Sequence, residues 1–205
     1  MSQIVLPLRS ASSGPPRIVV GNANAHVAEA LAAPATWPFR TAVLLGPPRS
    51  GKSLFARWFA GNAADHGGEA IDDAHRLDET ALFHRWNRAQ EAGTPLLIVG
   101  GEPPWNIALP DLRSRLGAAL QLEIGLPDEA MAEHLLHALA GQRGLALGAE
   151  AADYLVPRAG RSCADLEKLV AAIDRISLER KVPATHSIWR AALEAVLGPD
   201  EPRLL

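Results

Sequence analysis

The sequence lacks several features that mark secreted and membrane-spanning chains. Its 205 residues include a single cysteine, Cys163, so no intramolecular disulfide can form. No apolar run approaches the roughly 18 residues that a membrane-spanning helix needs. The first residues have neither a basic start nor a long apolar stretch, and they do not resemble a signal peptide. We therefore expect a cytoplasmic protein with no membrane partner.

The sequence also lacks an excess of positive charge. It contains 20 lysines and arginines against 23 acidic residues, which gives a net charge of −3. Affinity that depends on neutralising phosphates is disfavoured by this balance, so we expect no direct sequence-specific DNA binding. Hydrophobic residues make up 48% of the chain, enough for a real core, and the length suits one α/β core with a small appended domain.

The order of the hydrophobic patterns predicts three regions. Residues 1–17 read as an apolar tail followed by a linker, residues 18–126 as an α/β domain, and residues 127–205 as a small all-helical domain. Strands are expected at 41–45, before Asp72, at 95–100 and at 119–124, and helices at 24–33, 53–64, 78–92, 109–116, 128–142, 149–159, 162–180 and 185–197. Strands that alternate with helices indicate a parallel sheet covered on both faces.

The strongest motif lies between the strand at 41–45 and the helix that follows. It consists of Gly46, Pro47, Pro48, Arg49, Ser50, Gly51, Lys52 and Ser53. The two glycines let backbone N–H groups point inward at phosphates, and the start of the next helix adds partial positive charge. Lys52 would reach the β- and γ-phosphates, and the Ser53 hydroxyl would bind Mg²⁺. The sequence therefore predicts a site for ADP or ATP with Mg²⁺; the alternative is a chance glycine-rich turn.

Two acidic residues follow the weakly apolar segment that ends at Ile71. A carboxylate at the end of a neighbouring strand holds the water shell of Mg²⁺ in such sites, a role that we assign to Asp72. We expect Asp73 to orient a catalytic water; the alternative is a pair of solvated loop acids. Only 20 positions separate Lys52 from Asp72, which leaves room for little more than one helix. Of the four to five strands expected, four are therefore favoured.

Two further segments are candidates for contact with partners. The short helix at 109–116 carries Arg115, whose rigid guanidinium could stabilise charge on a transferred phosphoryl group; taken alone, it would more often be a surface charge. The tail consists of Gln3, Ile4, Val5, Leu6, Pro7 and Leu8. Such a segment can insert into an apolar pocket of a partner, or it can join the edge of the sheet.

Together these motifs resemble those of the Hda type of DnaA-related AAA+ proteins. The similar segments are Gln3–Leu8, Ile18–Asn24, Pro95–Pro104 and Leu109–Leu116. The resemblance implies an AAA+ core followed by a helical lid, with ADP in the phosphate loop. It implies that the tail docks on the DNA polymerase III sliding clamp. It also implies that Arg115 acts as an arginine finger in trans, stimulating ATP hydrolysis by DnaA to prevent re-initiation, and that the DNA-reading domain of DnaA has no counterpart here.

The sequence departs from this family at two positions. Gly100 and Gly101 supply no polar side chain to sense the γ-phosphate, and the lid position that usually carries an arginine is Ala164, so Arg161 is the candidate substitute. We therefore predict nucleotide binding with little intrinsic hydrolysis. Two alternatives stay open: an independent P-loop ATPase or small kinase, and a degenerate module with a structural nucleotide. The sequence does not decide between ADP and ATP or between a monomer and a homodimer.

Overall fold

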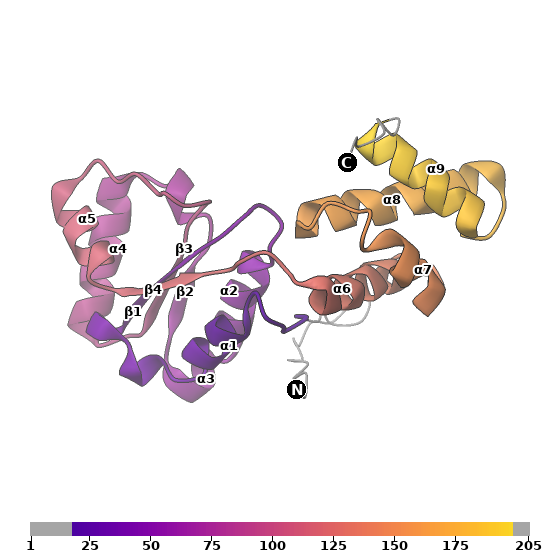
Figure 1. The fold of residues 1–205 in the computed structure, drawn as a ribbon. Helices are drawn as coiled ribbons and strands as arrows, with labels where there is room; N and C mark the ends of the chain where they lie inside the picture. The colour runs from indigo at the N-terminus through magenta and orange to yellow at the C-terminus, as the bar shows by residue number, and fades with distance from the viewer. Residues whose placement is uncertain (1–17, 199–205) are drawn as a thin grey trace. The chain divides into compact units, whose positions relative to one another are not determined.

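The structure is a computed structural model that describes residues 18–198. Its contacts divide the chain into two compact units at the junction between Gly125 and Leu126. The first unit packs helices against a parallel sheet, and the second contains helices only (Figure 1). The predicted partner-binding tail, Gln3–Leu8, lies outside the described residues.

The sheet of the first unit has four strands in the described residues, in the order β2–β3–β1–β4 and all parallel. The strands are β1 (Thr41–Leu45), β2 (Glu69–Ile71), β3 (Leu96–Val99) and β4 (Leu120–Glu123). In the centre of the sheet, Val43 lies opposite Ile98 on one side and Gln121 on the other. The parallel sheet, and the strand number that the short Lys52–Asp72 interval favoured, are both confirmed.

Helices cover both faces of this sheet (Figure 1). They are α1 (Ala25–Leu31), α2 (Lys52–Gly61), α3 (Ala63–His66), α4 (Glu79–Ala92) and α5 (Pro110–Gly117), with 3₁₀ turns η1 (Pro34–Thr36), η2 (Pro38–Arg40) and η3 (Ala74–Arg76). Alternate strand residues face opposite sides, so Leu44 packs with Phe55 and Phe59 of α2, whereas Ile98 packs with Leu82 of α4. The two apolar cores fix the sheet between its helical layers and hold its carboxyl edge in place.

The described residues of the second unit form four helices around one apolar core. They are α6 (Glu129–Gln142), α7 (Ala149–Leu155), α8 (Cys163–Arg180) and α9 (His186–Leu197). The core includes Leu136 of α6 and Ile173 of α8, both fully buried. The helix α6 begins at Asp128, whose side chain accepts a hydrogen bond from the Met131 amide.

The helix expected at 24–33 ends at Leu31. Two further helices are also shorter than the sequence predicts. The helix expected at 53–64 ends at Gly61, because Asn62 leaves the helical path and its side chain donates to the Trp58 carbonyl at 2.8 Å. The helix expected at 149–159 ends at Leu155, and Pro157 explains this end because it has no N–H to continue the ladder. Both errors concern helix ends, which short polar residues and prolines decide.

Candidate nucleotide-binding site

The loop between β1 and α2 adopts a backbone that requires glycine at two positions. Gly46 has a φ of +152°, and a Cβ there would lie 3.0 Å from the carbonyl oxygen of Ile124. Gly51 stands before α2 with a φ of +94°. Arg49 also has a positive φ, of +63°. The loop therefore turns back on itself, as expected for a segment that wraps around an anion.

Four polar groups of this loop have no protein partner among the described residues. Across the part of the chain that the structure describes, the backbone N–H groups of Gly51, Lys52 and Ser53 have no protein acceptor. The hydroxyl of Ser50 is buried and has no hydrogen-bond partner either. Buried polar groups are normally satisfied, and free amides at a helix start bind anions. The loop residues therefore fit a phosphate group.

Lys52 lies in a partly buried position beside the loop. Its Nζ donates hydrogen bonds to the carbonyl oxygens of Gly46 at 2.6 Å and Pro47 at 2.8 Å. Burial lowers the pKa of Lys52, and the negative charges of three carboxylates raise it in part: Asp72, Asp73 and Glu102. A phosphate would add to these negative charges and so favour the charged form of this partly buried lysine.

The structure brings the two predicted acidic residues, Asp72 and Asp73, to the same edge of the sheet as Lys52. Asp72 accepts a hydrogen bond from the Asp73 amide at 3.0 Å, and Asp73 has a left-handed backbone that starts η3. Asp73 also forms an exposed ion pair with Arg76 at 3.9 Å. In the described residues no cluster of three or more His, Cys, Asp or Glu side chains could hold a metal ion. Mg²⁺ at Ser53 and Asp72 would therefore depend on phosphate oxygens as well.

Glu102 is a charged residue of this site that the sequence analysis did not single out. Its carboxylate acts on Lys52 from the segment after β3, whereas the other two carboxylates follow β2. The signal was present, because Glu102 closely follows a buried strand, and carboxyl ends of parallel strands meet at one edge. Only the strand order shows that β3 lies beside β1, which leads into the loop.

Arg115, the predicted arginine finger, lies against the aromatic side chains of α4. Its guanidinium carbon is 4.6 Å from the ring centre of Trp86 and 4.9 Å from that of Phe83. No hydrogen bond or ion pair joins the Arg115 side chain to another described residue. Arg113, by contrast, donates to the carbonyl oxygens of Ile107 and Ala108 and so holds the loop before α5. Of the two arginines, Arg115 is thus the one whose donors are not committed to the fold.

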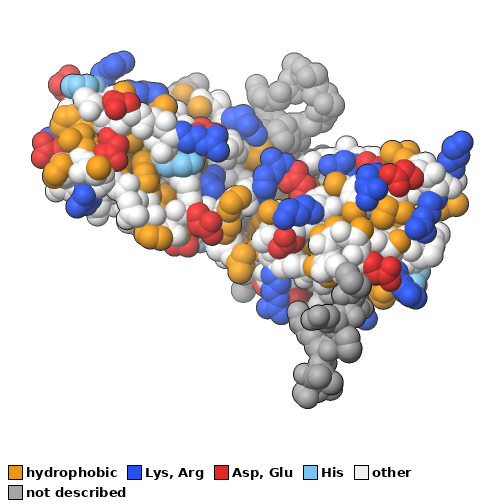
Figure 2. Space-filling view, turned by 90° about the horizontal axis from the view of Figure 1, so that it is seen from above, with side chains coloured by type: hydrophobic (Ala, Val, Ile, Leu, Met, Phe, Trp, Pro, Cys, Tyr) orange, Lys and Arg blue, Asp and Glu red, His pale blue; other side chains and the backbone are white. Residues whose placement is uncertain are grey.

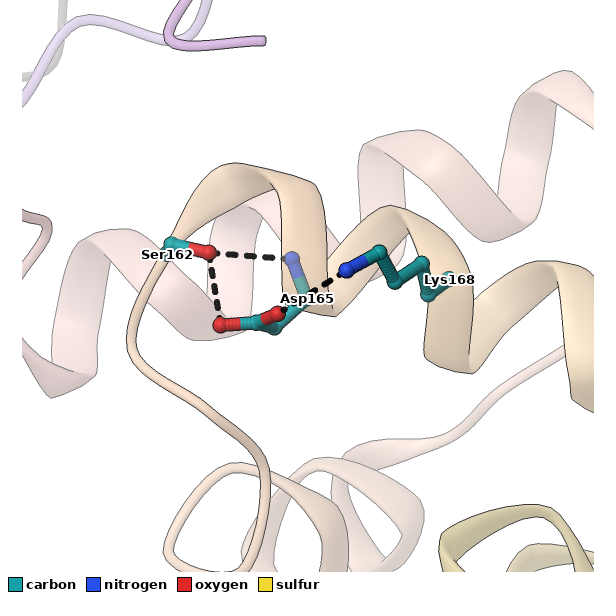
Figure 3. A network of polar contacts seen from close by, with 3 residues as sticks. All are labelled: Ser162, Asp165 and Lys168. Carbon is teal, nitrogen blue, oxygen red and sulfur yellow. Dashed lines mark hydrogen bonds and ion pairs between the residues drawn. The ribbon is translucent and has the colours of Figure 1, made fainter. Parts of the chain in front are cut away.

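Arg161, the predicted lid residue at the nucleotide, is exposed and directly precedes the start of α8. The first turn of α8 is fixed by the network in Figure 3: Ser162 donates to a carboxylate oxygen of Asp165 at 2.6 Å and accepts from the Asp165 amide at 3.1 Å. Lys168 completes it at 3.7 Å from Asp165. The helix start that carries Arg161 is therefore well defined, and its role toward a nucleotide stays a prediction.

Figure 2 shows lysine and arginine side chains interspersed with acidic ones on the face that it draws. None of the described helices has the length and apolar character needed to cross a membrane.

Comparisons with known proteins give a family match in the helical unit and one curated relative of part of the chain. Residues 128–186 match the family model described as "Hda, lid domain". An uncharacterized protein of Haemophilus influenzae is 34% identical over 106 residues, which are 49% of this chain and 45% of that protein. The match thus spans less than half of this curated relative.

Solved structures with a similar fold include two replication initiators and a DNA motor. Domain III of Thermotoga maritima DnaA has a TM-score of 0.72 at 15% identity, covering 89% of this chain and 95% of that one. DnaA bound to AMPPCP and single-stranded DNA has a TM-score of 0.62 at 17% identity, with 80% and 66% covered. The RuvB branch-migration motor of T. maritima has a TM-score of 0.62 at 20% identity, with 88% and 72% covered. At these identities the likeness shows the AAA+ fold, an α/β core with a helical lid, as the sequence predicts.

Proposed function

We propose that this Hda/DnaA-like AAA+ protein is a regulator of the replication initiator DnaA that binds ADP or ATP with Mg²⁺. The observation that carries the proposal is a set of donors at the start of α2 that have no partner among the described residues: the amides of Gly51, Lys52 and Ser53. The match of residues 128–186 to the Hda lid supports the link to DnaA. The AMPPCP bound to a similarly folded DnaA supports the nucleotide.

The phosphate loop residues Gly46–Ser53 would hold the nucleotide, with Lys52 on its terminal phosphates. When bound, the Mg²⁺–nucleotide supplies the phosphoryl group and its metal ion. Ser53 and Asp72 would fix the metal, and Asp73 would orient a water. Arg161 would approach from the lid. Because Gly100 carries no side chain at the end of β3, intrinsic hydrolysis would be weak.

Activity would then be expressed on a partner through Arg115. Among the described residues its half-buried guanidinium contacts two aromatic rings and forms no hydrogen bond, so it can turn toward a neighbouring nucleotide without breaking one. An arginine in trans raises the rate of phosphoryl transfer by stabilising charge in the transition state. The partner whose ATP is hydrolysed would be DnaA, and the reaction would take place in the cytoplasm.

A hydrolysis assay tests this role directly. DnaA loaded with ATP is incubated with the sliding clamp on DNA and with this protein, and ADP formation is followed. We expect stimulation by the wild type and loss of most of it in Arg115→Ala, while Arg88→Ala, an exposed arginine of α4, behaves as wild type. Equal stimulation by all three proteins would exclude the arginine-finger role.

We further propose that Gln3–Leu8 docks on the sliding clamp, with the glutamine amide fixing the orientation of the aliphatic residues. A pull-down with clamp compares wild type with Gln3→Ala plus Leu6→Ala. Loss of capture in the double variant is expected, and equal capture would remove the tail from the proposal. A homodimer on the two-fold clamp is compatible with this arrangement and is tested by sedimentation with and without clamp.

The second candidate is a degenerate AAA+ module in which a nucleotide only stabilises the fold. The two glycines at the end of β3 favour it, because they leave no side chain to read the γ-phosphate. In that case Lys52→Ala would lower the thermal stability of the protein in ADP, through loss of binding, without changing DnaA hydrolysis. Steady ATP hydrolysis by this protein alone would favour the independent ATPase instead.

A further inference from the structure

The end of β3 is closed to side chains by its neighbours. A Cβ on Gly100 would lie 2.5 Å from the Leu45 side chain and 2.8 Å from the ring of Trp105. A Cβ on Gly101 would lie 3.3 Å from the Cδ2 atom and 3.5 Å from the Nε2 atom of the His75 ring. Other residues thus occupy the space that a side chain at this strand end would need. Next to Gly101, the group in that space is the imidazole of His75.

This position belongs to the phosphate-binding edge. The carbonyl oxygen of Gly101 accepts a hydrogen bond from the Gly46 amide at 3.1 Å, so the residue against His75 is tied to the first residue of the phosphate loop. The Gly100 amide donates to the Leu44 carbonyl at 2.9 Å and keeps the strand end in register. Gly101 therefore connects His75 to the phosphate loop, because it contacts the His75 ring and is hydrogen-bonded to Gly46.

The backbone fixes His75 relative to the acidic pair. It lies in η3, which follows Asp72 and Asp73 directly and is anchored by the buried side chain of Ala74. His75 itself is exposed and has no hydrogen-bond partner among the described residues, and it lines a hollow of about 360 Å³ together with Gly101 and Glu102. Its ring nitrogens are therefore free to meet a ligand.

The charges at this edge explain why such a donor matters. The three carboxylates that act on the ammonium of Lys52 would repel the third phosphate of a triphosphate. An imidazole N–H next to that phosphate would offset part of the repulsion, since a hydrogen bond to a charged group is among the stronger kinds.

We infer that His75 is the residue that lets this protein bind a nucleoside triphosphate, by donating to the γ-phosphate from the exit of β2 in place of the side chain missing at Gly101. The inference rests on the proposed nucleotide site. It adds a residue that determines the preference of this site for a triphosphate over a diphosphate. His75 acts by binding and does not take part in bond making.

Calorimetric titration of the full chain with Mg–ATP and Mg–ADP tests the inference. In His75→Ala the affinity for ATP falls by about tenfold or more, as expected for a lost hydrogen bond to a charged group, while the affinity for ADP changes by less than about twofold. His75→Gln keeps an N–H donor and restores part of the ATP affinity. His84→Ala removes an exposed histidine from α4 and leaves both affinities unchanged.

Each other outcome overturns the inference in a recognisable way. Equal losses for ATP and ADP in His75→Ala assign the residue a structural role, and no loss for either nucleotide assigns it none. A wild type that binds neither nucleotide removes the proposed function itself. If the wild type binds both nucleotides and His75→Ala leaves the ratio of the two affinities unchanged, only this inference is overturned.

Discussion

The start of α2 in the α/β unit and the start of α8 in the helical unit are closed in different ways. The helix α8 begins at Ser162, whose side chain accepts a hydrogen bond from the Asp165 amide. Among the described residues α2 has no side-chain cap, and the buried Ser50 hydroxyl in the loop before it has no partner. The start of α8 is thus satisfied by its own sequence, whereas the start of α2 leaves donors that a ligand can satisfy.

Backbone strain follows the same division. In the described residues the helical unit has one non-glycine residue with positive φ, Lys181, which ends α8. The α/β unit has four, and two of them, Arg49 and Asp73, stand in the phosphate loop and beside the acidic pair. Strained residues persist where the surrounding structure holds them for a purpose, so their location agrees with that of the proposed site.

The largest effects should come from removing core side chains, and they test whether the two units are separate. Phe55→Ala in the α/β unit and Ile173→Ala in the helical unit each empty a fully buried site. We expect a loss of about 3–5 kcal/mol for the first and about 2–5 kcal/mol for the second. Hydrogen exchange should show lost protection within the substituted unit. Equal loss in both units would mean that they unfold together.

A glycine in each unit gives the next largest contrast. Gly100→Ala should cost about 1–3 kcal/mol, because its methyl group would overlap Leu45 and Trp105. Gly141→Ala in α6 meets no atom within 4 Å and should stabilise by about 0.5–1 kcal/mol, since glycine weakens a helix. Urea unfolding midpoints compare the two. A neutral Gly100→Ala would contradict the closed end of β3.

The cap of α8 provides a smaller effect. Ser162→Ala removes the acceptor of the Asp165 amide and should cost about 1 kcal/mol. Ser114→Ala, an exposed serine of α5, should change the free energy of unfolding by less than about 0.5 kcal/mol. Thermal unfolding of both variants checks this. If the two changes are equal, the network of Figure 3 does not stabilise the helix start.

The smallest effect is the pH dependence of nucleotide affinity, which tests the charge of Lys52 in the α/β unit. Burial lowers the pKa of Lys52 in the free protein, and a bound phosphate would raise it again. Nucleotide affinity should therefore be highest at pH values below this lowered pKa, where Lys52 is charged. It should decline as the pH rises through that pKa. The decline should begin below the usual lysine range. Lys52→Arg should bind with little dependence on pH, and an identical decline in that variant would rule out Lys52 as its source.

The sequence predicted those parts of the structure that depend on local pattern. The buried strand at 41–45 and the helix at 162–180 were foreseen from apolar runs and spacing. Glu102 and His75 were not, because their nearness to the loop depends on which strands are neighbours. The stacking of Arg115 on Trp86 likewise depends on how α4 packs beside α5, which no local pattern states.

The most direct test of the account is calorimetric titration of the wild type and Lys52→Ala with Mg–ADP, after far-UV circular dichroism has shown that the variant is folded. The account predicts that the wild type binds and that the variant loses about tenfold or more in affinity, because the ammonium no longer meets the phosphates. Equal affinity of the two proteins, or no binding by either, would contradict it.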